Sequence, residues 1–160
     1  MRINPSAKKH CHIYDMDGVL VNSEHRYRVL DTGKIDLIHW RENEPLAYKD
    51  TLLPLATQYK ADLENPLCTV IICTARVLHN PDDEFIRDVL GCPNVVISRK
   101  IDDTRSSTIT KVNGLRKVFN LKGFQEFNAV RVWEDNHTYL KAICDAFNIM
   151  GVYVPSKQGH

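Results

Sequence analysis

The stretch around which the rest of the chain can be organised is Cys11-His12-Ile13-Tyr14-Asp15-Met16-Asp17-Gly18-Val19-Leu20. Its apolar first half predicts a buried strand, and Gly18 permits a sharp turn after it. Because side chains two apart on a strand point to the same face, Asp15 and Asp17 share a direction. Two carboxylates at the end of a buried strand are costly unless a cation or proton chemistry uses them. The stretch therefore indicates a catalytic or metal-binding turn, with an ordinary Asp-rich turn as the plainer alternative.

Apolar strand-like runs alternate with helical periodicity along the whole chain. The runs that predict strands are residues 10–15, 69–73, 94–97, 129–133 and 149–154. The segments that predict helices are residues 51–62, 81–90, 107–120 and 137–147. The strands are nearly continuous in apolar character, which favours a mostly parallel sheet of these five strands with helices on both faces. Ligands of such α/β folds bind outside the carboxyl ends of the strands.

Bulk properties narrow the class of protein. The 160 residues fit one domain, 1–160, and the net charge of +1 provides no overall field for binding nucleic acid. No run approaches the roughly 20 apolar residues of a membrane span, and no secretory signal opens the chain. The five cysteines form no Cys-x-x-Cys pair, so we expect reduced thiols in a cytoplasmic protein. A zinc site from His10, Cys11 and His12 is disfavoured, since successive strand residues face opposite ways.

A second candidate motif, Ile71-Ile72-Cys73-Thr74-Ala75-Arg76, ends the next long apolar run. A hydroxyl at a strand terminus, beside free backbone N–H groups, can hold a phosphate oxygen, which suits Thr74. The guanidinium of Arg76 can bind a second oxygen through its planar fork. The plainer alternatives are a turn cap for Thr74 and a solvated surface charge for Arg76.

Two further segments carry charged residues that are candidates for the same site. Lys111 lies one turn into a predicted helix and off its apolar stripe, with Lys100 as the competing candidate for the same role. Val130-Arg131-Val132-Trp133-Glu134-Asp135-Asn136 is another apolar run that ends in acids. Mg²⁺ prefers a few carboxylates together with water and phosphate oxygen, so Asp135, with Glu134 beside it, is a candidate ligand. A helix cap at Asp135 or Asn136 is the alternative.

These motifs, in this order, resemble those of the haloacid dehalogenase-like (HAD) phosphatases, from about residue 10 to residue 154. The resemblance implies a Rossmann-like three-layer α/β fold with a small or minimal cap, here an insertion at about residues 21–66. It implies that Asp15 is the nucleophile, that Asp17 is the acid/base, and that Lys111 stabilises the phosphoryl charge. It also implies Mg²⁺ as cofactor, held by Asp15, Asp17, Asp135 and Glu134, with Thr74 and Arg76 on the phosphate.

Within that superfamily the chain looks most like the 3′-phosphatase domain of phage-type polynucleotide kinase-phosphatases. The similarity rests on Asp103-Thr104-Arg105 before the lysine, on Arg76, on Arg26 eleven residues after Asp15, and on the adjacent acids. It implies that Arg26 also binds the substrate phosphate. The chain departs from that group at Ser107 and Glu134, where the group has Asp, and no Gly-x-x-x-x-Gly-Lys-Ser/Thr of a kinase half occurs.

The sequence therefore predicts a Mg²⁺-dependent phosphomonoesterase that acts through an aspartyl-phosphate on nucleic-acid 3′-phosphate ends or on nucleotides. A 5′-nucleotidase or small-metabolite phosphatase is the alternative enzyme. A catalytically silent HAD-like module that binds nucleic acid or protein is the alternative of another class. The expected partner is a phosphomonoester substrate, with no membrane and no obligate protein partner in evidence.

Overall fold

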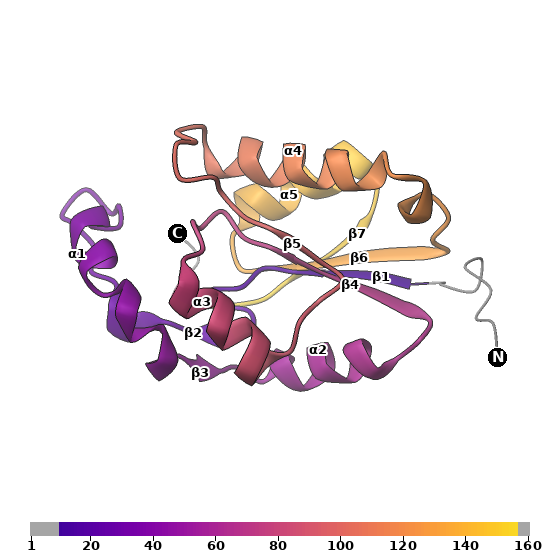
Figure 1. The fold of residues 1–160 in the computed structure, drawn as a ribbon. Helices are drawn as coiled ribbons and strands as arrows, with labels where there is room; N and C mark the ends of the chain where they lie inside the picture. The colour runs from indigo at the N-terminus through magenta and orange to yellow at the C-terminus, as the bar shows by residue number, and fades with distance from the viewer. Residues whose placement is uncertain (1–9, 157–160) are drawn as a thin grey trace.

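The computed structural model of the protein describes residues 10–156. Its centre is a parallel sheet in the order β5-β4-β1-β6-β7. The strands span β1 His10–Tyr14, β4 Cys68–Cys73, β5 Val95–Ile97, β6 Ala129–Glu134 and β7 Met150–Tyr153. The two neighbours of β1 are β4 and β6, so the carboxyl end of β1 lies at the middle of the sheet (Figure 1). The predicted five-stranded α/β fold is confirmed.

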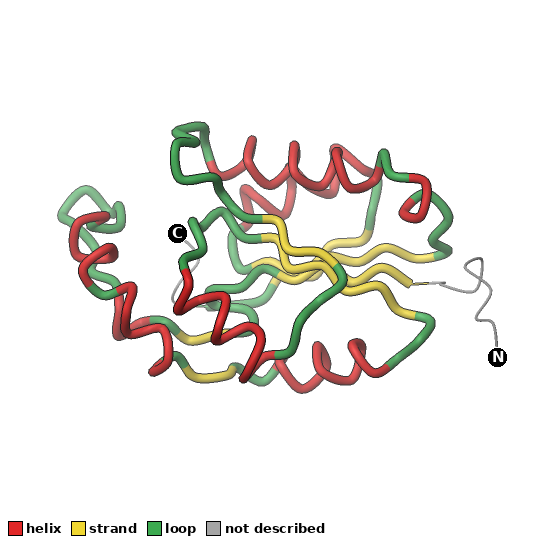
Figure 2. Tube along the Cα trace, viewed as in Figure 1, coloured by secondary structure: helices red, strands yellow, loops and turns green. Residues whose placement is uncertain are grey.

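Helices cover both faces of this sheet and complete three layers (Figures 1 and 2). One face carries α4 (Ser107–Phe119) and α5 (His137–Phe147), and the other carries α2 (Leu55–Glu64) and α3 (Asn80–Phe85), which continues into the π-helical turn η4 (Ile86–Leu90). Side chains from alternate positions of β1 enter two separate apolar clusters, with Ile13 in one and Tyr14 in the other. The helices thereby bury both faces of the central strand.

A small subdomain lies at the carboxyl ends of the strands (Figure 1). It contains the short antiparallel pair β2 (Val21–Asn22) and β3 (Thr51–Leu52), with η2 (Glu24–Arg26), α1 (Leu37–Glu42) and η3 (Glu44–Lys49) between them. We call residues 21–52 the cap. The predicted insertion at about 21–66 extends further, over α2, which packs on the main sheet (Figure 1).

Local sequence explains where the helices begin. The side chain of Ser106 accepts a hydrogen bond from the N–H of Ile109 at the start of α4, and Asn136 caps α5 through Tyr139. The predicted helix 51–62 begins later than expected, at Leu55. Thr51 and Leu52 pair with β2 instead, and Pro54, which lacks an N–H, stands at the N-cap.

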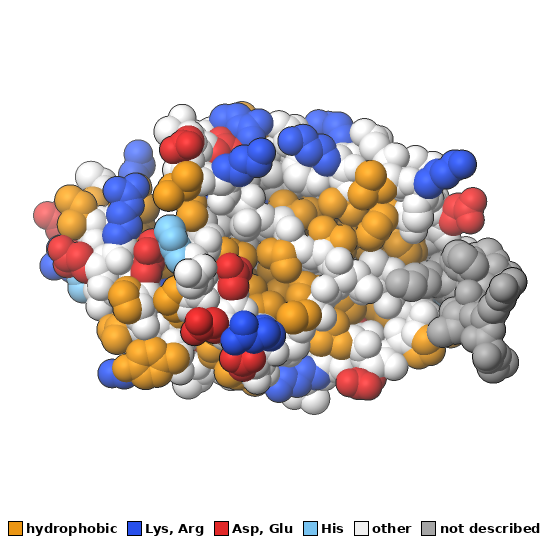
Figure 3. Space-filling model, in the orientation of Figure 1, with side chains coloured by type: hydrophobic (Ala, Val, Ile, Leu, Met, Phe, Trp, Pro, Cys, Tyr) orange, Lys and Arg blue, Asp and Glu red, His pale blue; other side chains and the backbone are white. Residues whose placement is uncertain are grey.

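Among residues 10–156, no helix has the length and apolar character needed to cross a membrane. Hydrophobic side chains gather on the face between α4 and the α2–α3 layer, where β5 forms the edge of the sheet (Figure 3). All five cysteines lie in the described part of the chain, and none of them forms a disulfide there.

Candidate active site

The carboxylates of Asp15, Glu134 and Asp135 converge where β1 and β6 end. The strands are paired in register, and the N–H of Asp15 donates to the carbonyl of Trp133 over 3.0 Å. One carboxylate oxygen from each of the three acids lies within 4.8 Å of the others, and all three residues are buried. Adjacent parallel strands thus bring together acids that lie about 120 residues apart in the sequence.

Lys111 lies against this acidic cluster. Its Nζ is 2.9 Å from Oδ1 of Asp15 and 2.5 Å from Oε2 of Glu134, and its side chain is 2% exposed. Burial by itself would lower the pKa of Lys111, but the two carboxylates raise it above its ordinary value, so the ammonium stays charged. Lys100 is exposed in the loop after β5. Of the two candidate lysines, the structure therefore brings Lys111 to the acids.

The cluster has the properties of a divalent cation site. Burial, with repulsion from neighbouring acids, raises the pKa of Asp15 to about 7 in spite of Lys111. Burial and the nearby Asp15 likewise raise the pKa of Asp135 to about 7. Oδ2 of Asp135 is buried and accepts no hydrogen bond from the described residues 10–156. An oxygen-only donor set with excess negative charge fits Mg²⁺, for which Asp135 offers its unpartnered Oδ2 and Asp15 a second carboxylate.

Glu134 has both carboxylate oxygens occupied. Oε2 accepts from Lys111, and Oε1 accepts from the backbone N–H groups of Asp135 and Asn136, each over 3.1 Å. In this arrangement Glu134 holds the lysine and the turn that presents Asp135. Glu134 thereby positions Asp135, and its predicted part in metal binding remains a prediction.

Asp17 lies in a different environment from Asp15. Its Oδ1 accepts hydrogen bonds from the hydroxyl of Ser23 over 2.7 Å and from Nη1 of Arg76 over 2.8 Å. Burial alone would raise the pKa of Asp17, but the Arg76 cation and the Ser23 hydroxyl together lower it below its ordinary value. The environment therefore raises the pKa of Asp15 and lowers the pKa of Asp17. Opposite shifts in neighbouring carboxylates are expected of groups with different chemical roles.

Thr74 and Arg76 occupy the turn that follows β4. Thr74 is 2% exposed, and its Oγ1 accepts a hydrogen bond from the N–H of Arg76 over 3.2 Å. The guanidinium of Arg76 bridges Asp17 and Asp82, the latter at the start of α3. The structure therefore places Arg76 beside the proposed acid/base, where a substrate phosphate would compete with two carboxylates for it.

Arg26 is fully buried in the cap. It binds Asp50 with two hydrogen bonds, of 2.9 and 2.7 Å, and lies 3.5 Å from Asp82. The ring of Trp40 lies 4.6 Å from the guanidinium carbon of Arg26 and 5.0 Å from that of Arg76. The contacts of Arg26 among the described residues are thus to protein groups, and its predicted contact with phosphate remains a prediction.

The sequence interpretation did not assign Asp50 or Asp82 to the site. Together with the two arginines and Asp17 they form a chain of alternating charges that joins the cap to the turn after β1 and is buried except at Asp17, which is partly exposed. Asp82 falls in Pro81-Asp82-Asp83-Glu84, a pattern that indicates the start of a helix. The pattern does not indicate that Asp82 also contacts Arg26 and Arg76. Only the tertiary structure brings these residues together.

Gly18 allows the turn after β1 to pass directly beside Asp135. Its φ is +80°, in the region that favours glycine, and a Cβ at this position would overlap Oδ2 of Asp135. Gly18 is therefore required for two reasons: the backbone has a positive φ there, and no space is left for a Cβ beside Asp135.

Comparisons with known proteins place the chain in a family. A family model described as bacteriophage T5 5′-deoxynucleotidase matches residues 3–148. The 5′-deoxynucleotidase of Escherichia phage T5 is 34% identical over 80 residues, which are 47% of this chain and 33% of that protein. The chain thus spans well under two thirds of this relative.

Solved structures share the fold. A chain of the Pnkp1/Rnl/Hen1 complex superposes with a TM-score of 0.64 at 16% identity, covering 94% of this chain and 47% of that one. A haloacid dehalogenase-like hydrolase from Streptococcus pneumoniae gives 0.65 at 9% identity, covering 94% and 88%. CbbY from Rhodobacter sphaeroides gives 0.64 at 14% identity, covering 94% and 88%. The resemblance to the HAD fold is confirmed.

Proposed function

The chain belongs to the bacteriophage T5 5′-deoxynucleotidase family, and from this premise we propose that it hydrolyses the 5′-monophosphates of deoxynucleosides. The observation that carries a phosphatase chemistry is the buried Asp15–Lys111 pair beside Asp135 at the carboxyl end of the central strand. The family match favours the 5′-nucleotide over the nucleic-acid 3′ end that the sequence motifs suggested. The preference for that substrate is a proposal, as is dependence on Mg²⁺.

The proposed first half-reaction is an in-line attack. Oδ of Asp15 forms a bond to phosphorus, the bond to the 5′ oxygen breaks, and an aspartyl-phosphate results. Lys111 favours the ionised form of Asp15 and offers positive charge to the phosphoryl oxygens. Mg²⁺ held by Asp15 and Asp135 would supply the charge neutralisation that lets a carboxylate approach an anionic phosphate.

Asp17 is proposed to move the protons. In the structure it is held ionised by Arg76, the form that accepts a proton from water when the aspartyl-phosphate is hydrolysed. In the first half-reaction it has to donate a proton to the departing 5′ oxygen. A substrate phosphate that binds Arg76 would weaken the Arg76–Asp17 contact, and the pKa of Asp17 would rise accordingly.

The test is a comparison of substrates on the purified protein with Mg²⁺. Phosphate release is measured from deoxynucleoside 5′-monophosphates, ribonucleoside 5′-monophosphates, nucleoside 3′-monophosphates, 3′-phosphorylated oligonucleotides and an aryl phosphate. We expect the highest kcat/KM for the deoxynucleoside 5′-monophosphates, loss of turnover in Asp15→Asn, and loss on chelation with recovery on Mg²⁺ addition.

Other outcomes would change the proposal in defined ways. A preference for the 3′-phosphorylated oligonucleotide would replace the substrate and keep the chemistry. Full activity in a folded Asp15→Asn variant would refute the aspartyl-phosphate. Failure to hydrolyse any of these esters would favour the silent binding module.

A further inference from the structure

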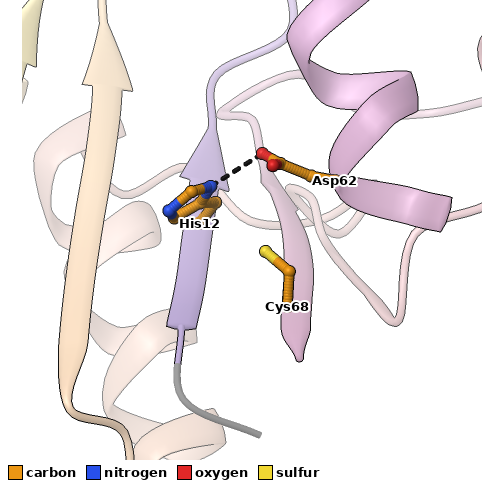
Figure 4. Close-up of side chains that lie close together, drawn as sticks. All are labelled: His12, Asp62 and Cys68. Atoms are coloured by element: carbon orange, nitrogen blue, oxygen red, sulfur yellow. Dashed lines mark hydrogen bonds and ion pairs between the residues drawn. The ribbon is translucent and has the colours of Figure 1, made fainter. Parts of the chain in front are cut away.

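A second cluster of metal-ligating side chains lies on the sheet face that α2 covers. His12 of β1, Asp62 of α2 and Cys68 of β4 converge on one point (Figure 4). One ligand atom from each lies within 4.8 Å of the other two. Nothing in the proposed phosphatase chemistry uses these residues, since they lie back along β1 from Asp15 and on separate elements.

The parallel sheet brings these residues together. β1 pairs with β4 so that His10 stands opposite Cys68 and His12 opposite Val70. His12 and Cys68 share the face toward α2, whereas Cys11 enters the core on the other face. The sequence argument against zinc applied only to neighbours along one strand, and the structure supplies a thiol from the adjacent strand instead.

The hydrogen bonds within the cluster hold its side chains in position and leave them able to bind a metal ion. Nδ1 of His12 is 2.7 Å from Oδ2 of Asp62, and that same oxygen accepts the hydroxyl of Tyr14 over 2.6 Å. Gln58 donates to the Tyr14 oxygen over 2.7 Å, so Asp62 is held in place from behind. Nε2 of His12 is buried and has no hydrogen-bond partner within residues 10–156.

Nδ1 is the nitrogen of His12 that faces the cluster. The His12 ring meets the Trp133 ring edge-on, with centroids 4.9 Å apart, and Nε2 points away from Asp62 (Figure 4). Because Oδ2 of Asp62 already accepts the hydroxyl of Tyr14, Nδ1 of His12 donates in the His12–Asp62 hydrogen bond. A metal ion at Nδ1 would displace that proton and take the lone pair that faces Asp62 and Cys68. The site is also reachable, since the His12 and Asp62 side chains are 12% and 13% exposed.

We propose that His12, Asp62 and Cys68 bind a divalent transition-metal ion of the zinc class, at a site separate from the active site. The nitrogen, oxygen and sulfur donors suit Zn²⁺, whereas the all-oxygen cluster of Asp15 and Asp135 suits Mg²⁺. In tetrahedral zinc sites neighbouring ligand atoms are about 3.5 Å apart, given Zn–N near 2.0 Å and Zn–S near 2.3 Å. Small side-chain rotations would bring the present set to that spacing, by widening the 2.7 Å contact of Nδ1 with Oδ2 and shortening contacts that are now within 4.8 Å.

The bound ion would fasten α2 to the two central strands. A helix, β1 and β4 each contribute one ligand, so binding favours the folded chain and is lost on unfolding. Water can complete the tetrahedron, as can His10, whose ring centroid is 6.1 Å from that of His12 and whose buried Nδ1 has no hydrogen-bond partner in the described residues.

Binding is tested on the full chain with Zn²⁺ and Co²⁺ in excess Mg²⁺, which would occupy the all-oxygen cluster. We expect one Zn²⁺ per chain, a rise in Tm on Zn²⁺ addition, and a thiolate-to-Co²⁺ charge-transfer band with tetrahedral d–d bands. Cys68→Ser should remove the charge-transfer band and lower Zn²⁺ affinity at least tenfold, because changes even to outer-shell partners of a metal cost about that much.

Matched controls separate this site from others. Cys92→Ser and Cys144→Ser change thiols that lie elsewhere in the fold and should leave the band and the affinity unchanged. Asp15→Asn should also leave them unchanged, so the result is independent of the proposed phosphatase. Asp62→Asn, which is nearly isosteric, serves if Cys68→Ser fails to fold. The proposal is overturned if the wild-type chain shows no thiolate band with Co²⁺, or if neither ligand variant weakens Zn²⁺ binding.

Discussion

Nζ of Lys111 lies 2.9 Å from Oδ1 of Asp15, and both groups are withdrawn from water, with side-chain exposures of 2% and 10%. The same nitrogen contacts Glu134, so one cation serves two buried carboxylates. Charges placed this way depend on one another, because removal of one leaves the others desolvated and unpaired. The relationship links the stability of the fold to the proposed nucleophile.

We expect Lys111→Met to destabilise the protein by about 3–5 kcal/mol and to abolish phosphate release, since it strands Asp15 and Glu134 in the interior. Urea denaturation and the phosphatase assay measure the two effects. Lys100→Met removes an exposed lysine and should change the free energy of unfolding by less than about 0.5 kcal/mol. Adding Glu134→Gln to Lys111→Met should recover part of the stability. A loss below about 1 kcal/mol in Lys111→Met would contradict the buried pairing.

Arg76→Gln should raise the pKa of Asp17, because it removes the cation that lowers it. The limb of the pH–rate profile that reports Asp17 should then move to higher pH, with a fall in kcat/KM from the lost phosphate contact. Arg87→Gln is the matched control, since Arg87 is exposed and pairs with Asp88. A profile that keeps its shape and position in Arg76→Gln would show that Arg76 does not set the protonation of Asp17.

Gly18→Ala should disrupt the acidic cluster, whereas Gly33→Ala should not. Both glycines have a φ of +80°, but a Cβ at Gly18 would overlap Asp135 and one at Gly33 would meet nothing within 4 Å. The backbone strain of about 1 kcal/mol is therefore common to both variants, and the difference between them reports the overlap. Thermal unfolding and the Mg²⁺ concentration at half-maximal activity are the measurements. Equal behaviour of the two variants would exclude a close packing of Gly18 on Asp135.

The metal-free protein should lose stability as the pH rises from about 4 to about 7. The pKa values of Asp15 and Asp135 are about 7 in the folded chain, against about 3.9 when unfolded, so the folded state binds more protons across that window. Above both values the contribution is constant. Tm measured from pH 4.5 to 8 in chelator should show the fall, and Asp135→Asn should flatten part of it.

Magnesium should offset this loss, because it binds the ionised carboxylates. The increase in Tm on Mg²⁺ addition should therefore be larger at pH 8 than at pH 5, where protons compete for Asp15 and Asp135. An increase of the same size at both pH values would place the ion elsewhere.

The sequence by itself determined the fold class and the turn that carries Asp15 and Asp17. Apolar runs of strand length alternating with helical periodicity require a parallel sheet covered on both faces, and such a sheet puts the ends of its strands at one edge. Period and order along the chain are local properties, so they can be read without coordinates. Thr74 and Asp135, which directly follow β4 and β6, lie at that edge for the same reason.

Only the tertiary structure decided which charges meet. In the structure Lys111, and not Lys100, contacts Asp15. Arg26 pairs with Asp50, and Asp82 of α3 pairs with Arg76. The tertiary structure also set Cys68 of β4 beside His12 of β1, which no spacing along one strand could indicate. These pairings depend on strand register, on where each helix begins and on how the cap packs, and all of these are settled by the burial of side chains that lie far apart in the sequence.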